Sequence, residues 1–151
     1  MNKKAFTMVE LLFVMFIIAI LTAIAIPNLF SQTSISTIQT MKTDTQGIRH
    51  LCSIYYKNHF NYNGFENFQN NHKFEDTDSD GRANKGGINN DGKIDGYYVN
   101  LSTDNVATIY SKKCNNNDDD DSGYIIEITN PNTDKIIFFD SCTDSSPHLK
   151  N

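Results

Sequence analysis

The sequence predicts an α+β protein in which one long N-terminal helix packs against a small antiparallel β-sheet. Two observations predict the helix. A nearly uncharged apolar run extends from Phe6 to Pro27, and further apolar side chains then recur every three or four residues as far as His59. A third observation predicts the sheet, because short β-branched and aromatic runs alternate with turn-forming residues between Tyr97 and Asp140.

The apolar run reads FTMVELLFVMFIIAILTAIAIP and is long enough to cross a bilayer. About twenty helical residues span a hydrocarbon core of about 30 Å. Glu10 is the one charged residue in this run. An unpaired carboxylate in hydrocarbon costs roughly 2.5–3.5 kcal/mol on insertion scales, so we expect Glu10 to have a partner. Lys3 and Lys4 precede the run, and positive residues at that flank favour a cytoplasmic N-terminus.

Two simpler interpretations of the apolar segment are open. A secretory signal peptide would be cut after its apolar core, and Ala23-Ile24-Ala25 resembles such a cleavage site. An uncleaved signal anchor would span the membrane equally well. The run is long for the core of a signal peptide, and Glu10 would have no purpose there, which disfavours the first of these.

The next part of the helix is amphipathic. Its stripe is formed by residues at a 3-4-3-4 spacing, namely Ile38, Met41, Thr45, Ile48, Cys52, Tyr55 and His59. One helix from Phe6 to about Phe60 is predicted, weakened at Pro27 and Gly47. On this stripe, Cys52 is expected to be a buried free thiol and His59 a packed side chain rather than a metal ligand.

Four strands are predicted after the helix, at Tyr97–Leu101, Val106–Tyr110, Tyr124–Ile128 and Lys135–Asp140. Short connections between neighbouring strands favour an antiparallel meander. We expect its apolar face to cover the stripe of the helix.

Length and charge limit the possible roles of this chain. About 120 residues follow the apolar segment, enough for one soluble domain with a core. The formal net charge is −5, which disfavours binding of nucleic acid through its phosphates. Three cysteines in an exported chain suggest one disulfide and one leftover thiol.

An acidic repeat with a spacing of eleven residues predicts a calcium site. Asp78-Ser79-Asp80-Gly81-Arg82-Ala83-Asn84 aligns with Asn89-Asn90-Asp91-Gly92-Lys93-Ile94-Asp95. Alternating oxygen side chains followed by a Gly turn suit Ca²⁺, which takes six to eight oxygen ligands at about 2.3–2.6 Å. The candidate ligands are Asp76, Asp78, Asp80, Asn84, Asn89, Asp91 and Asp95.

The likeness of this repeat to an EF-hand loop is partial. Gly87 stands where a loop beginning at Asp76 would need its bidentate acid. We therefore expect the two halves to share one or two Ca²⁺ ions, with metal in place of an apolar core. A solvated acidic loop without an ion is the alternative, and Mg²⁺ suits such a cage less well.

No catalytic constellation is recognisable in this sequence. No Ser or Cys has a plausible base and orienting acid, and His50, His59, His72 and His148 show no zinc-like grouping. Asp118 to Asp121 lack alternation and an internal Gly, so they are interpreted as a solvated hairpin tip. An enzyme is therefore not expected.

The string Lys4-Ala5-Phe6-Thr7-Met8-Val9-Glu10 resembles the type III signal of type IV pilins and type II secretion pseudopilins. A basic leader, an aromatic residue, an acid at this offset and Pro27 occur together, although Ala5 replaces the usual Gly. The resemblance implies cleavage between Ala5 and Phe6 by prepilin peptidase and methylation of the new amine. Phe6, Glu10 and Pro27 would then serve assembly.

This resemblance implies a pilin-like architecture with a leader at 1–5, a transmembrane and filament-core helix at 6–30, and an exported head at 31–151. It also implies a disulfide near the C-terminus, between Cys114 and Cys142, which would close a surface loop. The expected location is the inner membrane, with the N-terminus cytoplasmic, and afterwards a periplasmic pseudopilus or an extracellular pilus.

The function implied is that of a structural subunit of a type IV pilus or type II secretion pseudopilus, with a head stabilised by calcium. Its partners would be copies of itself in a homo-oligomeric filament, other pilins, prepilin peptidase and the inner-membrane assembly platform. The alternative is a minor or tip pilin, or an anchored calcium-dependent binding module for adhesion or DNA uptake. No clear nucleic-acid site supports the last of these.

Overall fold

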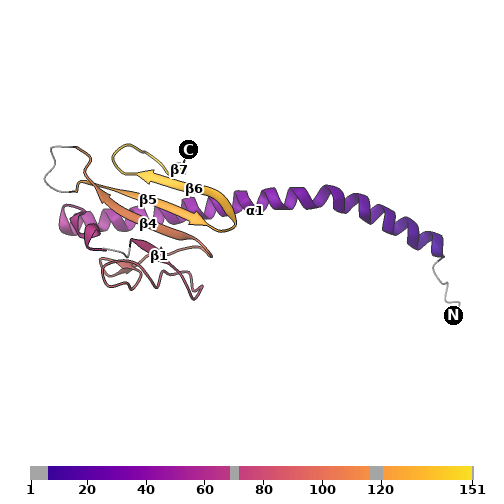
Figure 1. The fold of residues 1–151 in the computed structure, drawn as a ribbon, viewed down its shortest axis with the longest axis horizontal. Helices are drawn as coiled ribbons and strands as arrows, with labels where there is room; N and C mark the ends of the chain where they lie inside the picture. Colours follow the sequence, from indigo (N-terminus) through magenta and orange to yellow (C-terminus); the bar gives the residue numbers. More distant parts are fainter. Residues whose placement is uncertain (1–6, 69–71, 116–120, 151) are drawn as a thin grey trace. The chain divides into compact units, whose positions relative to one another are not determined.

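A computed structural model describes residues 7–68, 72–115 and 121–150, with the backbone alone described at 26–31 and 66–68 (Figure 1). The chain divides into two compact units, Met1–Ser36 and Thr37–Asn151. Each unit is described by itself below.

One helix, α1, runs from Met8 to His59, as the sequence predicts, and continues through both Pro27 and Gly47. It ends because Phe60 adopts a left-handed conformation with φ of 62°. The N–H of Phe60 donates to the carbonyl of Tyr56 at 2.7 Å, which satisfies one of the last carbonyl groups of the helix.

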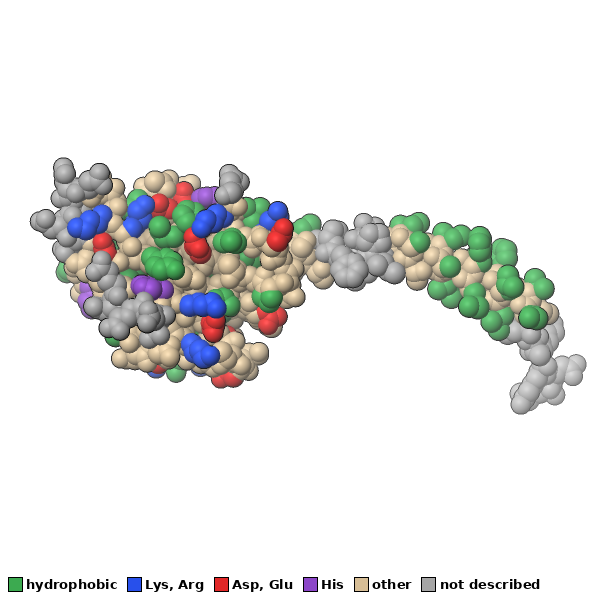
Figure 2. Space-filling view, viewed as in Figure 1, with side chains coloured by type: hydrophobic (Ala, Val, Ile, Leu, Met, Phe, Trp, Pro, Cys, Tyr) green, Lys and Arg blue, Asp and Glu red, His purple; other side chains and the backbone are tan. Residues whose placement is uncertain are grey.

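The first unit contains the one helical segment in the described residues that could cross a membrane by length and composition, Met8–Ala25. Its side chains are exposed throughout. Figure 2 shows hydrophobic side chains gathered over this part of the chain. An apolar surface of this extent requires a nonpolar environment or partner.

The second unit contains an antiparallel sheet of five strands in the order β1-β4-β5-β6-β7 (Figure 1). The long strands β4 (Val106–Lys112), β5 (Gly123–Asn130) and β6 (Thr133–Asp140) form the expected meander. Two short strands extend it, β1 (Lys73–Glu75) beside β4 and β7 (His148–Leu149) beside β6. A 3₁₀ helix, η1 (Asn63–Phe68), follows α1.

The first predicted strand, Tyr97–Leu101, was wrongly assigned to this sheet. Only Tyr97–Tyr98 forms a strand, β3, and it pairs with β2 (Lys93–Ile94) in a separate two-stranded sheet. The following residues hydrogen-bond to the acidic loop instead, where the N–H of Ala83 donates to the carbonyl of Val99 at 2.8 Å. The place beside β4 is taken by β1, which is too short to show a period-two pattern.

The core of the second unit forms between the rear part of α1 and one face of the sheet. The predicted stripe is buried at Met41, Thr45, Ile48, Cys52 and Tyr55. These side chains belong to the same buried cluster as apolar residues of the three long strands, among them Ala107, Ile109, Ile126, Ile128, Ile137 and Phe139. The α+β, pilin-like fold class is therefore confirmed.

His59 is the exception on the stripe. It was expected to be packed, but its side chain is 44% exposed. Its ring stacks on Tyr55 with centroids 4.2 Å apart, and its Nε2 lies 3.2 Å from Asp95. The buried stripe therefore ends at Tyr55, about one turn before the helix ends at His59.

A buried polar network that the sequence did not reveal ties α1 to the turn before β4. Asp44 is buried, and its carboxylate accepts hydrogen bonds from the backbone N–H and hydroxyl of Ser102, at 2.7 and 2.9 Å. Its Oδ2 also accepts from the amide of Asn105 at 2.7 Å. Asn105 in turn accepts from Asn130 at 2.7 Å. Among the side chains that the structure describes, no buried nitrogen or oxygen lacks a hydrogen-bond partner.

Candidate functional site

The start of α1 is a capping box formed by Thr7 and Glu10. The backbone N–H and the hydroxyl of Thr7 donate to Glu10 Oε2 at 2.9 and 2.8 Å, and the N–H of Glu10 donates to the Thr7 hydroxyl at 3.3 Å. This reciprocal arrangement satisfies two of the unpaired donors at a helix N-terminus. Glu10 therefore has an intramolecular partner in the single chain.

The side chains of the other three predicted processing and assembly residues are not described. Ala5 and Phe6 lie outside the described residues. Pro27 lies within the helical backbone of α1. Of the assembly residues, Glu10 is the one whose side-chain contacts are described.

The eleven-residue acidic repeat is visible in the backbone. Ser79 and Asn90, which align, both have positive φ, at 61° and 53°. Gly81 and Gly92, which also align, have φ of 86° and 72°. The repeated sequence therefore forms a repeated turn, and each turn needs Gly at its last position because a side chain there is strained.

The first half of the repeat brings together Asp76, Asp78 and Asp80. One carboxylate oxygen from each lies within 4.8 Å of the others. Asp76 also accepts from the N–H groups of Ser79 and Gly81, at 2.7 and 2.8 Å. Although desolvation acts to raise the pKa of Asp76, these hydrogen bonds outweigh it and hold that pKa below its usual value.

Asp91 and Asp95, the other candidate carboxylates, do not join that group. Asn84 accepts from the N–H and hydroxyl of Thr77, at 3.2 and 3.0 Å. Asp95 accepts from Asn58 at 2.6 Å and contacts His59. Residues of the second half, Asn89, Asp91 and Asp95, line a separate cavity of about 190 Å³ together with Lys93.

The expectation that this loop has no apolar residues for a core is wrong. Ala83 and Ile94 are fully buried and belong to the main core. Gly92 packs so closely on the backbone that an added Cβ would lie 1.8 Å from the carbonyl oxygen of Ala83. The loop is therefore fixed by packing and backbone hydrogen bonds as well as by its polar side chains.

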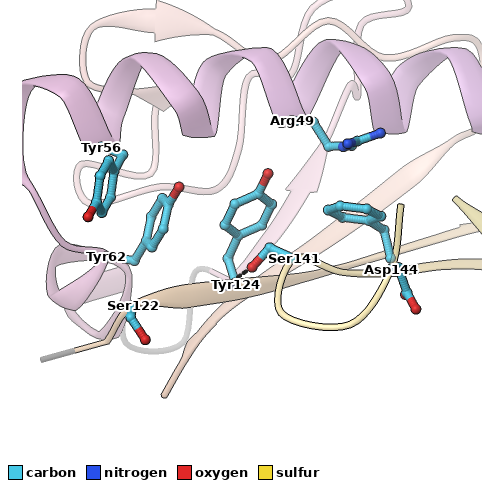
Figure 3. A pocket seen from close by; sticks show the side chains of 8 residues that line it. Arg49, Tyr56, Tyr62, Ser122, Tyr124, Ser141 and Asp144 are labelled. Carbon is cyan, nitrogen blue, oxygen red and sulfur yellow. Dashed lines mark hydrogen bonds between the residues drawn. The ribbon is translucent and has the colours of Figure 1, made fainter. Parts of the chain in front are cut away.

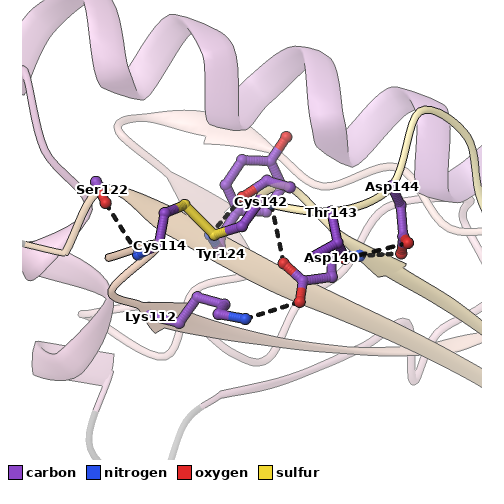
Figure 4. The surroundings of a disulfide bond; sticks show 9 residues. Lys112, Cys114, Ser122, Tyr124, Asp140, Cys142, Thr143 and Asp144 are labelled. Carbon is purple, nitrogen blue, oxygen red and sulfur yellow. Dashed lines mark hydrogen bonds and ion pairs between the residues drawn. A yellow bond between two sulfur atoms is a disulfide. The ribbon is translucent and has the colours of Figure 1, made fainter. Parts of the chain in front are cut away.

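The disulfide expected between Cys114 and Cys142 is present (Figure 4). Cys52 is a buried free thiol, and burial raises its pKa. The disulfide joins the end of β4 to the turn after β6, and it encloses the acidic run 118–121. Of that run, residues 118–120 lie outside the described part of the chain, whereas Asp121 is buried rather than solvated.

Charge-assisted contacts fix the backbone beside the disulfide. Lys112 Nζ donates to Asp140 at 2.7 Å, and the N–H of Cys142 donates to the same carboxylate at 2.9 Å (Figure 4). Desolvation acts to raise the pKa of Asp140, but these contacts outweigh it and hold that pKa below its usual value.

Two comparisons with known proteins gave no match, one with curated proteins and one with solved structures. A family model described as the prokaryotic N-terminal methylation motif matches residues 1–26. The matched residues include the basic leader, the apolar helix and Glu10. The chain therefore carries, in residues 1–26, the prepilin-type signal of type IV pilins and pseudopilins, joined to an α+β fold of pilin type.

Proposed function

We propose that this chain is a structural subunit of a helical filament, either a type IV pilus or a type II secretion pseudopilus. The observation that supports this most strongly is the coincidence of three features. The methylation motif, an exposed apolar helix and one carboxylate near the start of that helix occupy the same residues. The motif points to a structural protein rather than an enzyme.

Processing would occur at the membrane. Prepilin peptidase would cut between Ala5 and Phe6 and methylate the amine of Phe6, leaving the apolar helix in the mature chain. The helix would hold the subunit in the inner membrane, with the N-terminus cytoplasmic, until the assembly platform transfers it to the filament. Copies of this chain and other pilins would be its partners there.

Glu10 would select the register of an incoming subunit. Cleavage places a positive amine at Phe6 in an apolar layer, where an unmatched charge is costly. A neighbouring subunit could offer its Glu10 carboxylate to that amine. In the single chain this carboxylate accepts from Thr7, so assembly would add an ionic partner to a group that the capping box already positions.

Glutamine at position 10 separates the charge of Glu10 from its capping role, because Gln also serves in a capping box. We expect Glu10→Gln and Glu10→Ala to insert and be processed normally, and to yield far fewer sheared filaments than wild type. Two controls accompany these variants. A gel shift shows whether the leader has been cleaved, and fractionation shows whether the chain has entered the membrane. Wild-type filament amounts from Glu10→Gln would refute the charge pairing.

The head would bind Ca²⁺ through the group formed by Asp76, Asp78 and Asp80. Three carboxylates lie close together, and within the described ranges no Lys, Arg or His forms a salt bridge with them. Each carboxylate oxygen that accepts a backbone N–H retains a lone pair for a cation. Oxygen donors of this kind suit a hard ion such as Ca²⁺.

Thermal unfolding of the full chain in detergent tests the calcium site. Calcium at about a hundred times its Kd should stabilise the head by about 2.7 kcal/mol. Asp78→Asn should reduce that gain, while Asp134→Asn, which alters an exposed carboxylate on another hairpin, should not. Equal melting temperatures with calcium and with chelator would leave only a solvated acidic loop.

Abundance distinguishes a main filament subunit from a minor or tip subunit. A main subunit should form the bulk of sheared filaments. If this chain is instead only a trace component of sheared filaments, it acts at the tip or in priming.

A further inference from the structure

A cavity of about 360 Å³ lies in the head between α1 and the C-terminal half of the sheet (Figure 3). Its walls come from separate parts of the sequence. The lining residues used below are Arg49 and Tyr56 of α1, Tyr62 after α1, Tyr124 of β5, Phe139 of β6 and Ser141 after β6. A cavity of this size can accommodate a ligand of about one sugar ring.

Arg49 supplies a cation that no carboxylate neutralises among the described residues. Its guanidinium carbon lies 4.1 Å from the ring centroid of Phe139, and no ion pair in the described ranges includes it. The one acid lining the cavity, Asp144, accepts from the N–H of Asp140 at 2.7 Å. Figure 3 shows its carboxylate directed away from the guanidinium. The cavity therefore presents a positive charge.

Hydroxyl groups provide the other polar contacts of this cavity. Ser141 Oγ accepts from the backbone N–H of Tyr124 at 2.7 Å, which leaves its own O–H to donate. The hydroxyls of Tyr62 and Tyr124 point toward the α1 side of the cavity in Figure 3. The Tyr124 hydroxyl already accepts from Arg49, so it and Ser141 have their own O–H groups to donate to a ligand rich in hydroxyls.

Tyr56 provides an apolar surface at the rim. Its side chain is 42% exposed, whereas Tyr62, Tyr124 and Phe139 are buried. The C–H face of a sugar ring can pack on an exposed aromatic ring of this kind. Figure 3 shows Tyr56 and Arg49 at opposite ends of the α1 side of the cavity, so one end offers an apolar contact and the other a cationic one.

We propose that this cavity binds a sugar that carries a carboxylate, with Arg49 on the carboxylate, the Ser and Tyr hydroxyls on the sugar hydroxyls, and Tyr56 against the ring. A guanidinium presents parallel N–H donors that match a carboxylate. Because the chain as a whole has a net charge of −5, long-range attraction does not favour anions. Recognition must therefore come from these local contacts. This would give the head a binding role in addition to its place in a filament.

Titration calorimetry of the full chain in detergent tests this, with D-glucuronate, D-glucose and acetate as probes. Glucuronate should bind, and both glucose and acetate should bind at least about tenfold more weakly, since each lacks one set of contacts. Arg49→Gln should weaken glucuronate binding roughly tenfold to a hundredfold, the range expected for a hydrogen bond to a charged group. Lys57→Gln removes an exposed cation from the same helix and should have no effect.

Two further variants keep the proposal falsifiable if Arg49→Gln alters folding. Arg49→Lys retains the charge and should bind glucuronate with intermediate affinity. Tyr56→Ala should weaken glucuronate binding and leave acetate binding unchanged. Equal affinity for glucose and glucuronate would overturn the role of Arg49, equal affinity for acetate would overturn the sugar contacts, and no binding of glucuronate would overturn the proposal as a whole.

Discussion

Replacing Gly123 by Ala tests the packing around the disulfide. Gly123 begins β5, and an added Cβ would lie 2.4 Å from the sulfur of Cys142 and 2.6 Å from that of Cys114. Real Cβ atoms essentially never approach other atoms within 3.0 Å. Since the sulfur atoms are held by a covalent bond, either β5 or the disulfide must shift.

Two limits bound the cost of Gly123→Ala. If the strand shifts and the disulfide persists, overpacking costs about 1–3 kcal/mol. If the disulfide is lost, the loop-entropy model gives about 3.5 kcal/mol for the sequence separation of 28 residues between Cys114 and Cys142. The expected destabilisation therefore lies between about 1 and 3.5 kcal/mol.

The assay is urea unfolding of the full chain in detergent, with and without the disulfide. In a Cys114→Ala/Cys142→Ala background the two sulfur atoms are gone, and the remaining close contact of the added Cβ is Ser141 Oγ at 2.9 Å. Gly123→Ala should then cost clearly less than it does beside the intact disulfide. An equal loss of stability in both backgrounds would show that the contact with the disulfide does not limit this position.

Three further substitutions test other contacts in the head. Asp44→Ala should cost roughly 2–4 kcal/mol in urea unfolding, because it leaves buried donors unpaired, whereas Asp44→Asn should cost less. The pKa of Asp140 is depressed, so the carboxylate stabilises the folded state fully above its ordinary pKa of about 4. This stabilisation is lost as the pH falls through the folded-state pKa. Asp140→Asn should therefore flatten that part of the curve of unfolding free energy against pH. Gly92→Ala should lower the free energy of unfolding more than Gly81→Ala. Both glycines have positive φ, but only a Cβ at Gly92 would clash with the Ala83 carbonyl. Equal losses of unfolding free energy would show that this clash has no effect.

The parts of the fold that could be predicted from sequence are those with a long periodic signal. The 3-4-3-4 spacing from Ile38 to Tyr55 identified the buried face of α1. The β-branched and aromatic runs separated by turn residues identified the meander of β4, β5 and β6. The strands β1 and β7 have three and two residues, too few for a pattern. Their position depends on backbone hydrogen bonds to neighbours distant in sequence.

The spacing of residues along the chain predicted only part of the candidate sites. Asp76, Asp78 and Asp80 are brought together as their spacing suggests, because one turn contains them. Asp95 is drawn instead to the end of α1, through a tertiary contact that spacing does not encode. The Arg49 cavity could not have been found from sequence, since its walls come from several elements.

The sequence also contains a signal for the partner of Glu10. The Thr-x-x-Glu pattern of Thr7 to Glu10 immediately precedes an apolar helix and is typical of a capping box. It provides the intramolecular partner of Glu10. The carboxylate is thus positioned at the helix start before any second subunit is present.

Intact mass and N-terminal sequencing of the chain from sheared filaments and membranes test the central claim most directly. A prepilin-type subunit should begin at an N-methylated Phe6, and the same mature chain should be present in both fractions. A start at Ile26 would identify a cleaved secretory signal, and an uncut N-terminus in the membrane would identify a simple anchor. Either result would contradict the filament subunit proposed here.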